Sequence, residues 1–392
     1  MLLTCDEALV RILGATEPVD RPGEWLAVGA PSPIRVLAEP LVASGDHPRF
    51  DNSAVDGYAF QATDLGDVGR SMPIAFTVAT GPQECPPLVR GSAARIFTGA
   101  RIPTGTAAIA MQEDVDVVDG CVSLREALDL GQGIRRVGTD FHAGDLLVTA
   151  GTPVTPGVAG LLASQGLTRP QVTALPRCIV VTTGDEIVAP EREPGPGELR
   201  DSIGAMLLVA GGAYAVMSLA YSPDDPGRLK EVLSVASQHA DAVFVAGGAS
   251  VGDRDFTARV IGELGRVDFH GISVRPGKPL LFGQINGKPV MGLPGNPASA
   301  YVCFHVFGVP LLRRLGGWSD PNHLWFEARF GANHPAEARD VFVRVTLTGG
   351  VATPVHEQAS FGLKSLGAAQ ALARLRAGLA VNEGEAVSVT LI

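Results

Sequence analysis

Cysteine is scarce in this sequence, and neither cysteine nor histidine occurs in a metal-binding spacing. No CxxC pair is present, and the five cysteines are dispersed: Cys5, Cys85, Cys121, Cys178 and Cys303. That distribution argues against a disulfide framework or a zinc site and is typical of small buried residues in a reducing cytoplasm. The eight histidines are scattered as well, without an HExxH motif, so neither zinc catalysis nor a Cys–His nucleophile has support.

Long apolar runs and an excess of positive charge are also missing. No run approaches the ~20 apolar residues of a membrane helix. The opening MLLTCDEALVRILG lacks the basic start and the cleavage site of a secretion signal. The net charge of −10 argues against a protein that binds the phosphate backbone of nucleic acid. We therefore expect a cytoplasmic protein that binds neither membranes nor nucleic acid.

The common nucleotide-binding fingerprints do not occur either. The sequence has no GxGxxG motif, no Walker loop and no repeat of fixed period. What remains is the composition of a compact globular protein of 392 residues, 46% hydrophobic and 18% charged, long enough for two or more domains. Its 48 glycines and 29 prolines predict many turns.

Four regions differ in their residue patterns. Helical patterns occur at 6–13, at 34–41 and again at about 158–167, where Thr155-Pro156-Gly157 starts the helix. Residues from about 50 to 143 contain short apolar runs cut by glycine and proline, which predict β-strands. Strands and helices alternate from about 176 to 320. Strand patterns return in WFEARF, VFVRVTL and VATPV beyond Trp318.

The alternating region predicts a mostly parallel sheet with helices on both faces. Its strands are CIVVTT, AYAVMSLAYS and DAVFVA, and its helices begin after the capping positions Asp201-Ser202 and Asp224-Asp225-Pro226. Ligands of such sheets bind beyond the carboxyl ends of the strands, where TTGDE and GGASVGDRD lie. The glycines allow backbone N–H groups to approach an anion, and the adjoining acids, Asp253 and Asp255, suit a cation or a water molecule.

A second stretch suited to an anion follows at 275–300. Arg275 and Lys278 flank a Pro-Gly turn, Asn286-Gly287 predicts a hairpin turn, and Gly295-Asn296-Pro297 opens a helix. Two fixed cations and a helix N-terminus suit phosphate or another oxyanion. Either piece alone could be an ordinary turn; the two together favour an oxyanion site.

Other polar positions are also explained by local structure. In DNSAVDGY the polar groups, including Asp56, suit Asx hydrogen bonding, and Thr98 ends a strand. Asp140 suits a solvated loop acid, and Glu186 suits a turn cap. Only the fold could bring these side chains together.

The sequence resembles the molybdopterin molybdenumtransferase family, which comprises the MoeA proteins and the E domain of gephyrin and its plant relatives. The resemblance covers essentially the whole chain and is carried, in the family's order, by DNSAVDGYA, RIFTGARIPTGTAAIAMQED, RRVGTDFHAGD, VVTTGDEIV, GGASVGDRDF, RPGKPLLFG and GLPGNPAS. It implies an enzyme that combines adenylylated molybdopterin with molybdate, releases AMP and yields molybdenum cofactor. Mg²⁺ is the expected cofactor, and a molybdopterin adenylyltransferase is a possible partner.

The resemblance also implies a multidomain α/β plus β architecture in an elongated homodimer. Residues 1–48 and 144–175 would form a helical linking domain, 49–143 a β-rich domain, and 321–392 a β-barrel-like C-terminal domain. The parallel-sheet domain at 176–320 would bind molybdopterin and resemble the adenylyltransferases that make the substrate.

The family's functional positions carry over by motif. The implied catalytic residues are Asp56, Thr98, Asp140, Glu186 and Asp255, with Asp56 and Thr98 supplied by the partner subunit. The implied metal ligands are Glu186, Asp224 and Asp255. The implied substrate-binding residues are Asp201, Ser202, Ser250, Asp253, Arg275, Lys278, Pro294, Pro297, Arg339, Arg344 and Ser360, of which Arg339 or Arg344, and Ser360, would face molybdate.

Three departures from the family pattern leave other functions open. Ile203 stands where the family usually has asparagine, Gly271 stands where bacterial relatives often have lysine, and SFGLKSLGAAQALARL replaces a serine-rich pattern. The alternatives are a paralogue that handles another metal, such as tungstate, and a gephyrin-like scaffold with weak activity. An adenylyltransferase is a third alternative, although GGASVGD replaces the TGGTG-type loop of those enzymes.

Overall fold

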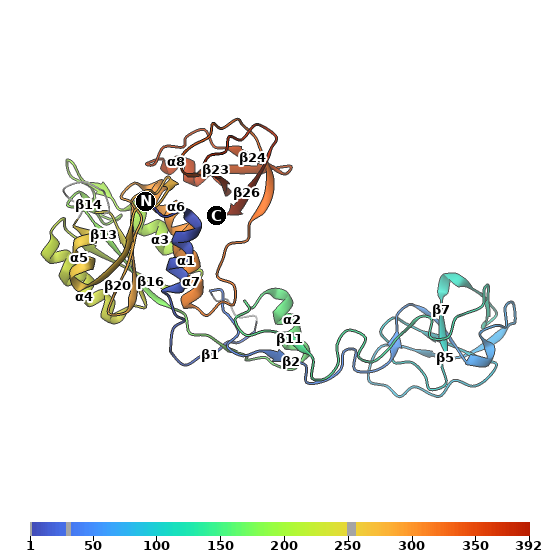
Figure 1. The fold of residues 1–392 in the computed structure, drawn as a ribbon. Helices are drawn as coiled ribbons and strands as arrows, with labels where there is room; N and C mark the ends of the chain where they lie inside the picture. The colour runs from blue at the N-terminus through green and yellow to red at the C-terminus, as the bar shows by residue number, and fades with distance from the viewer. Residues whose placement is uncertain (1, 29–32, 249–255) are drawn as a thin grey trace. The chain divides into compact units, whose positions relative to one another are not determined.

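The computed structural model describes residues 2–28, 33–248 and 256–392. The chain divides into two compact units (Figure 1). The smaller unit comprises Pro40–Val148 and Leu161–Leu167; the larger comprises Met1–Glu39, Thr149–Gly160 and Thr168–Ile392.

The smaller unit is built on a six-stranded sheet in the order β7-β4-β6-β5-β9-β8. In chain order these strands are β4 (Gly57–Phe60), β5 (Met72–Val78), β6 (Ala93–Ile96), β7 (Ala108–Met111), β8 (Val115–Val118) and β9 (Cys121–Leu124). Two short antiparallel pairs accompany them: β2 (Leu41–Val42) with β11 (Leu146–Val148), and β3 (Asn52–Ser53) with β10 (Ile134–Arg135). The prediction of β structure from about 50 to 143 is confirmed.

The larger unit contains a second six-stranded sheet, in the order β16-β13-β17-β21-β20-β18. The parallel strands are β13 (Arg177–Thr183), β16 (Val216–Ser222), β17 (Ala242–Ala246) and β21 (Lys288–Leu293). The antiparallel strands are β20 (Leu281–Ile285) and β18 (Gly265–His270). The expected parallel sheet is confirmed, and Asn286-Gly287 forms the expected turn between β20 and β21.

Helices cover both faces of this sheet, which explains why its central strand β17 is apolar and buried at every position. Phe244 packs into the core that includes α1 (Cys5–Gly14), α3 (Ser202–Gly212), α6 (Pro297–Cys303) and α7 (Val309–Leu315). Its neighbours Val243 and Val245 face the core formed with α4 (Pro226–His239) and α5 (Thr257–Leu264). A π-helical turn, η3 (Phe304–Gly308), joins α6 to α7.

One of the three helices predicted outside the sheet region is absent. The helices predicted at 6–13 and beyond Thr155 are α1 and α2 (Pro156–Ser164). The prediction of a helix at 34–41 is wrong. Leu37 N–H donates to Thr152 O and Ala38 N–H donates to Gln171 O, instead of to carbonyls four residues earlier. Backbone pairing with distant residues therefore replaced the helix in this segment.

The C-terminal sheet of the larger unit closes on itself. Its order is β19-β23-β24-β22-β26-β25, and β25 also pairs with β23. The strands are β22 (Phe326–Phe330), β23 (Asp340–Thr348), β24 (Val351–Pro354), β25 (Ala371–Leu375) and β26 (Ala386–Leu391), with α8 (Leu363–Ala368) between β24 and β25. The edge strand β19 (Val274–Arg275) comes from the chain of the α/β domain and pairs in parallel with β23. A segment that follows the α/β sheet strand β18 in the chain thus adds an edge strand to the barrel sheet.

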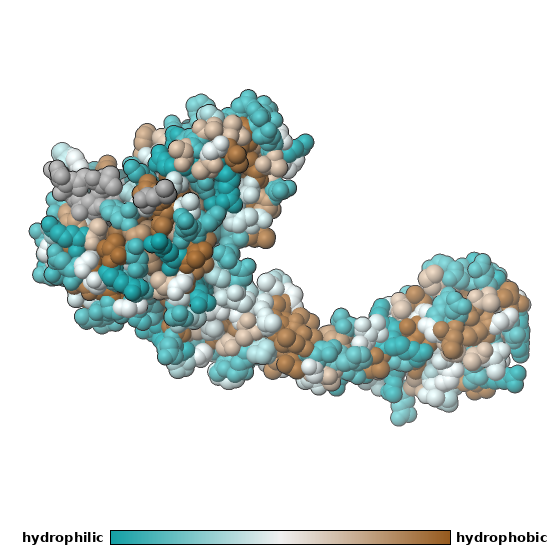
Figure 2. Space-filling model, in the orientation of Figure 1, coloured by the Kyte–Doolittle hydropathy of each residue, from teal (hydrophilic) through white to brown (hydrophobic). Residues whose placement is uncertain are grey.

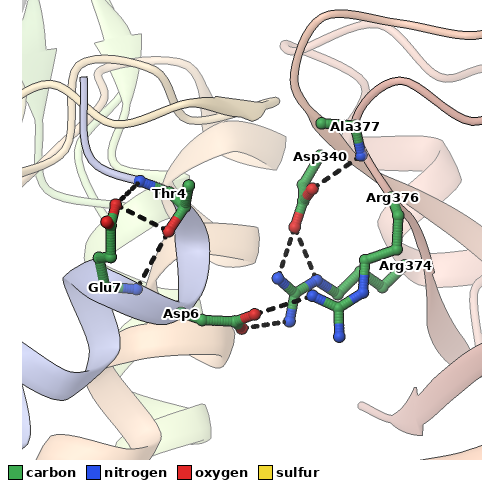
Figure 3. Close-up of polar contacts among 7 residues, drawn as sticks. All are labelled: Thr4, Asp6, Glu7, Asp340, Arg374, Arg376 and Ala377. Carbon is green, nitrogen blue, oxygen red and sulfur yellow. Dashed lines mark hydrogen bonds and ion pairs between the residues drawn. The ribbon is translucent and has the colours of Figure 1, made fainter. Parts of the chain in front are cut away.

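An ionic network ties the first helix to this barrel (Figure 3). The buried Arg374 donates to Asp340 and, through Nη1, to Asp6 Oδ1 at 2.6 Å; Arg376 Nη1 lies 2.8 Å from Asp6 Oδ2. Asp340 Oδ1 also accepts from Ala377 N at 2.9 Å. Partial burial of Asp6 would raise its pKa, but the hydrogen bonds and charges of the two arginines outweigh burial and lower it.

The remaining short elements are strands and single turns. They are β1 (Glu24–Trp25) paired with β12 (Gln171–Val172), β14 (Ile187–Val188) paired with β15 (Leu199–Arg200), and the 3-10 turns η1 (Ala62–Asp64) and η2 (Gln112–Asp114). Figure 2 shows hydrophilic and hydrophobic residues interspersed over the visible face of the larger unit, which is ordinary for a globular surface. In the described part of the chain, no helix has the length and apolar character needed to cross a membrane.

Candidate active site

A cavity of about 750 Å³ lies at the carboxyl ends of the parallel strands, where the sequence predicted a ligand. We call it the strand-end cavity. It is lined by the ends of β13 and β17, by the first turns of α3 and α6, and by two residues of the barrel. Its lining includes Gly184, Glu186, Ile187, Leu199, Asp201, Ser202, Ile203, Asp224, Gly247, Gly248, Pro297, Phe361 and Leu363.

Glycine is required where β17 ends at this cavity. Gly247 and Gly248 have φ values of +96° and +64°, in the region that side chains disfavour. A Cβ on Gly247 would lie 2.7 Å from Thr183 O, and one on Gly248 would lie 2.6 Å from Thr257 Oγ1. The loop therefore presents bare backbone to the cavity, as an anion-binding loop must.

Two predicted metal ligands, Glu186 and Asp224, line the strand-end cavity together. The loops that carry them adjoin, because Asp224 N–H donates to Asp185 Oδ1 at 3.1 Å. Within the described residues, no three His, Cys, Asp or Glu side chains gather closely enough to hold a metal ion. The third predicted ligand, Asp255, lies outside the described residues, as do Ser250 and Asp253.

Asp201 lines the same cavity, and its carboxylate is already held by the protein. Its Oδ1 accepts from Gly204 N at 2.8 Å and its Oδ2 from Thr182 Oγ1 at 2.9 Å. The predicted N-cap of α3 is therefore confirmed. Asp201 fixes the helix start to the end of β13, with Ser202 as the first helical residue.

A second cavity, of about 500 Å³, lies between the Arg275–Lys278 turn and the barrel. We call it the barrel-edge cavity. It brings together four residues predicted to bind substrate: Arg275, Lys278, Arg339 and Ser360. Their positions follow from the pairing of β19 with β23, which lays the turn against the barrel.

The charges of this cavity are partly balanced. Arg275 Nη1 lies 2.6 Å from Glu337 Oε1, and His334 Nε2 lies 3.7 Å from the same oxygen. Arg339 Nη1 makes one long contact of 3.5 Å to Val274 O. The turn therefore presents an exposed Lys278 ammonium beside a guanidinium that already has a carboxylate partner.

The start of α6 differs from the expectation that it offers N–H groups to an oxyanion. Pro297 occupies the first turn and has no N–H. The next two amides, of Ala298 and Ser299, donate to Ser360 O at 2.9 and 3.3 Å. These amides already have an acceptor because a carbonyl of the barrel caps the helix. Pro297 lines the strand-end cavity, whereas Pro294 is buried and lines neither cavity.

Arg344 also differs from its predicted role in substrate binding. Its side chain is fully buried and lines neither cavity. Its Nη2 donates to Glu357 O and Ala359 O at 3.1 Å each, and burial lowers the pKa of the guanidinium. Arg344 thus supports the segment that ends in Ser360, and Arg339 is the arginine of this pair at the cavity.

In the smaller unit, Asp56 and Thr98 form a pair. Asp56 Oδ1 accepts from Thr98 N and from Thr98 Oγ1, both at 2.7 Å, and these hydrogen bonds lower the pKa of Asp56. Asp140 lies elsewhere in this unit, in a cavity of about 420 Å³ that it shares with His47 and Arg135. The structure therefore brings Asp56 and Thr98 together but places Asp140 in a separate pocket.

Several lining residues were missed from the sequence. Leu199, Phe361 and Leu363 line the strand-end cavity, and Asn333, His334 and Gln358 line the barrel-edge cavity. The polar residues of this set lie in GANHP and HEQAS, which follow β22 and β24. Such strand-end turns were a usable signal. For the apolar residues, the sequence offered no signal beyond the divergence of SFGLKSL from the family pattern.

Comparison with known families agrees with this architecture, an α/β ligand-binding domain joined to β domains. Residues 3–166 match the MoeA N-terminal region (domain I and II), 179–314 match the "Probable molybdopterin binding domain", and 328–392 match the MoeA C-terminal region (domain IV). The chain therefore belongs to the MoeA family, as its motifs suggested.

Individual relatives cover most of the chain. It is 35% identical over 330 residues to the molybdopterin molybdenumtransferase of Haemophilus influenzae, covering 82% of this chain and 80% of that protein. It is 32% identical over 390 residues to that of Bacillus subtilis, covering 94% and 90%. A crystal structure of the molybdopterin biosynthesis MoeA protein from Pyrococcus horikoshii OT3 superimposes with a TM-score of 0.85, at 26% identity over the full length of both chains. The predicted multidomain fold is confirmed.

Proposed function

We propose that this protein is a molybdopterin molybdenumtransferase that joins molybdate to adenylylated molybdopterin and releases AMP. The observation that carries the proposal is the adjacency of two different cavities. Pro297 lines the strand-end cavity and Ser299, two residues later, lines the barrel-edge cavity; Phe361 and Ser360 do the same from the barrel. One wall thus separates a glycine-lined cavity with carboxylates from a cationic one.

The chemistry of each cavity suits one of the two substrates. Bare backbone at Gly247 and Gly248 suits the phosphates of an adenylylated substrate. Lys278, Arg275 and Arg339 suit the dianion molybdate and offset its repulsion from those phosphates. Tungstate has the same shape and charge as molybdate, so the test below compares the two anions.

Mg²⁺ fits the carboxylates of the strand-end cavity. It is often bound by one or two protein carboxylates completed by substrate phosphates, and Glu186 and Asp224 provide two on adjoining loops. A bound Mg²⁺ would neutralise phosphate charge and polarise the bond to AMP. In this proposal Asp255 is the third ligand, or holds the attacking water.

A homodimer is part of the proposal. The Asp56–Thr98 pair belongs to the smaller unit, and we propose that a second copy of the chain supplies it to the strand-end cavity, with Asp140 close by. We further propose that the enzyme works in the cytoplasm and receives its substrate from a molybdopterin adenylyltransferase. Scaffolding alone would not require both cavities with their charged residues.

The test follows AMP release from adenylylated molybdopterin in the presence of Mg²⁺, with molybdate, with tungstate or with neither. Release that depends on molybdate and yields molybdenum cofactor is the expected result. Release with tungstate in place of molybdate would favour the altered-metal paralogue. Binding of adenylylated molybdopterin without release of AMP would favour a scaffold. Formation of the adenylylated pterin from ATP would favour an adenylyltransferase.

Lys278→Ala separates the oxyanion role from folding. The turn residues Pro276 and Gly277 remain, so we expect an unchanged fold and a KM for molybdate raised about tenfold, the effect of losing a charge-assisted contact. Lys288→Ala is the matched control, because Lys288 is also exposed beside a turn but lines neither cavity. Equal KM values for the two variants would remove Lys278 from the site.

A further inference from the structure

Phe361 is an unusual residue of the strand-end cavity. It lines the cavity from the barrel side, and 66% of its surface is exposed. Among the described residues that line this cavity it is the one aromatic. A large aromatic side chain on the wall of a ligand-sized cavity offers a flat apolar face to a bound molecule.

The backbone around Phe361 is fixed on both sides. Before it, Ser360 O accepts from Ala298 N and Ser299 N, and Ala359 O accepts from the buried Arg344. After it, Gly362 N–H donates to Ala359 O at 3.1 Å, and Gly362 O accepts from Ser365 Oγ at 2.7 Å. The ring is therefore presented by an anchored segment, and its exposure is not that of a loose loop.

The lining of this cavity contains both apolar and polar groups. Ile187, Leu199, Ile203 and Leu363 are apolar side chains of the cavity, and Glu186, Asp224 and the glycine backbone are among its polar groups. A cavity of this kind suits a ligand that carries both a flat ring and phosphates. Ile203 adds to the apolar lining, because it replaces a polar residue expected there with an apolar one.

We propose that Phe361 is a substrate-binding residue that contacts the face of a planar heteroaromatic ring of the substrate. This inference rests on the proposed function, whose substrate carries two such rings, a pterin and an adenine. Ring-on-ring contact with a protein aromatic is sequence-tolerant and contributes to binding more than to chemistry. Replacement of Phe361 therefore changes affinity, while kcat stays within about twofold.

The test compares Phe361→Ala, Phe361→Leu and Phe361→Tyr with the wild type. It measures the KM for adenylylated molybdopterin and, by titration, the Kd for AMP and for pterin-6-carboxylate. We expect Phe361→Ala to raise the KM, and one of the two Kd values, about tenfold, the usual order for a lost stacking contact. The ligand that responds identifies the ring. Phe361→Tyr keeps the ring and should stay within about threefold of wild type, whereas Phe361→Leu keeps apolar bulk only and should lose most of the affinity.

Leu379→Ala is the control, because Leu379 is an apolar barrel residue of similar exposure, 60%, that lines none of the cavities described above. The inference is overturned if Phe361→Ala keeps wild-type affinity for all three ligands, or if leucine serves as well as tyrosine. Failure of the proposed function looks different. In that case the wild type releases no AMP, while the titrations still report whether Phe361 contacts a ring.

Discussion

The ion pair between Arg275 and Glu337 makes a prediction about molybdate that runs against simple intuition: removing a side chain beside the cavity should improve binding. Arg275 is 59% exposed and its backbone is fixed by β19, while Glu337 Oε1 lies 2.6 Å from Arg275 Nη1. Glu337→Gln retains an amide oxygen that accepts the same hydrogen bond. The change therefore removes a negative charge and leaves the guanidinium in place.

The expected size follows from Coulomb's law. The relevant quantity is the repulsion between the Glu337 charge and the anion; two unit charges about 4 Å apart interact by about 1 kcal/mol at the dielectric constant of water. At about 1.4 kcal/mol per factor of ten, the KM for molybdate should fall about fivefold in Glu337→Gln. The assay is AMP release against molybdate concentration at low ionic strength. At about 1 M salt, where charges are screened within about 3 Å, the improvement should largely disappear.

Glu327→Gln provides the control for net charge, since Glu327 is an exposed barrel carboxylate that lines neither cavity. It should leave the KM for molybdate unchanged. A KM for Glu337→Gln that is equal to or above the wild-type value at low salt would refute the reasoning. It would mean that the carboxylate positions Arg275, or that Arg275 does not face the anion.

Three further predictions concern stability. Asp340→Asn should lower the free energy of unfolding by about 3 kcal/mol, because it leaves the buried Arg374 without its closest carboxylate. Asp6→Asn should lower it by less than about 1 kcal/mol, because Asp6 is largely exposed. Hydrogen exchange in the barrel measures both losses, and equal losses would contradict the assignment. Because the folded-state pKa of Asp6 is lowered, its contribution is present above the usual carboxyl pKa of about 3.9 and is lost as the pH falls through the lower folded value, so the wild type and Asp6→Asn should converge only in acid. Asp201→Ala should lower the free energy of unfolding by about 2 kcal/mol in urea, because it removes the cap of α3 and the partner of Thr182. Asp201→Asn should lower it by less than half of that. Similar values for the two variants would show that the cap does not depend on the side-chain oxygen.

Much of the α/β domain was predictable because its signals are local. The cap at Asp201, the hairpin turn at Asn286-Gly287 and the proline start of α6 each lie next to the element they define. The position of a cavity at the strand ends followed from the parallel order alone. The prediction for 34–41 failed for the opposite reason: backbone N–H groups of this segment donate to carbonyls more than a hundred residues away.

The barrel-edge cavity was only half predictable. Arg275 and Lys278 were recognisable beside their turn, but nothing near residue 337 in the sequence marks Glu337 as the partner of Arg275. Arg344 was assigned to substrate only through the resemblance to the family, as the alternative to Arg339. In the structure Phe342, on the same face of β23, packs into the core of the α/β domain. Both faces of this strand are covered, and the arginine is buried with them.

The sharing of β19 has a consequence for dissecting this protein into parts. Val274 and Arg275 belong by chain to the α/β domain and by hydrogen bonding to the barrel, through the pairs Val274 with Asp340 and Arg275 with Val341. A fragment that ends before the barrel would expose a bare strand edge, which invites association between copies. A barrel fragment would lose a strand and the lysine-bearing turn. Neither fragment contains the whole barrel-edge cavity, because that cavity is lined by residues of both parts. The cavity is therefore a property of the intact chain and cannot be transplanted with one domain.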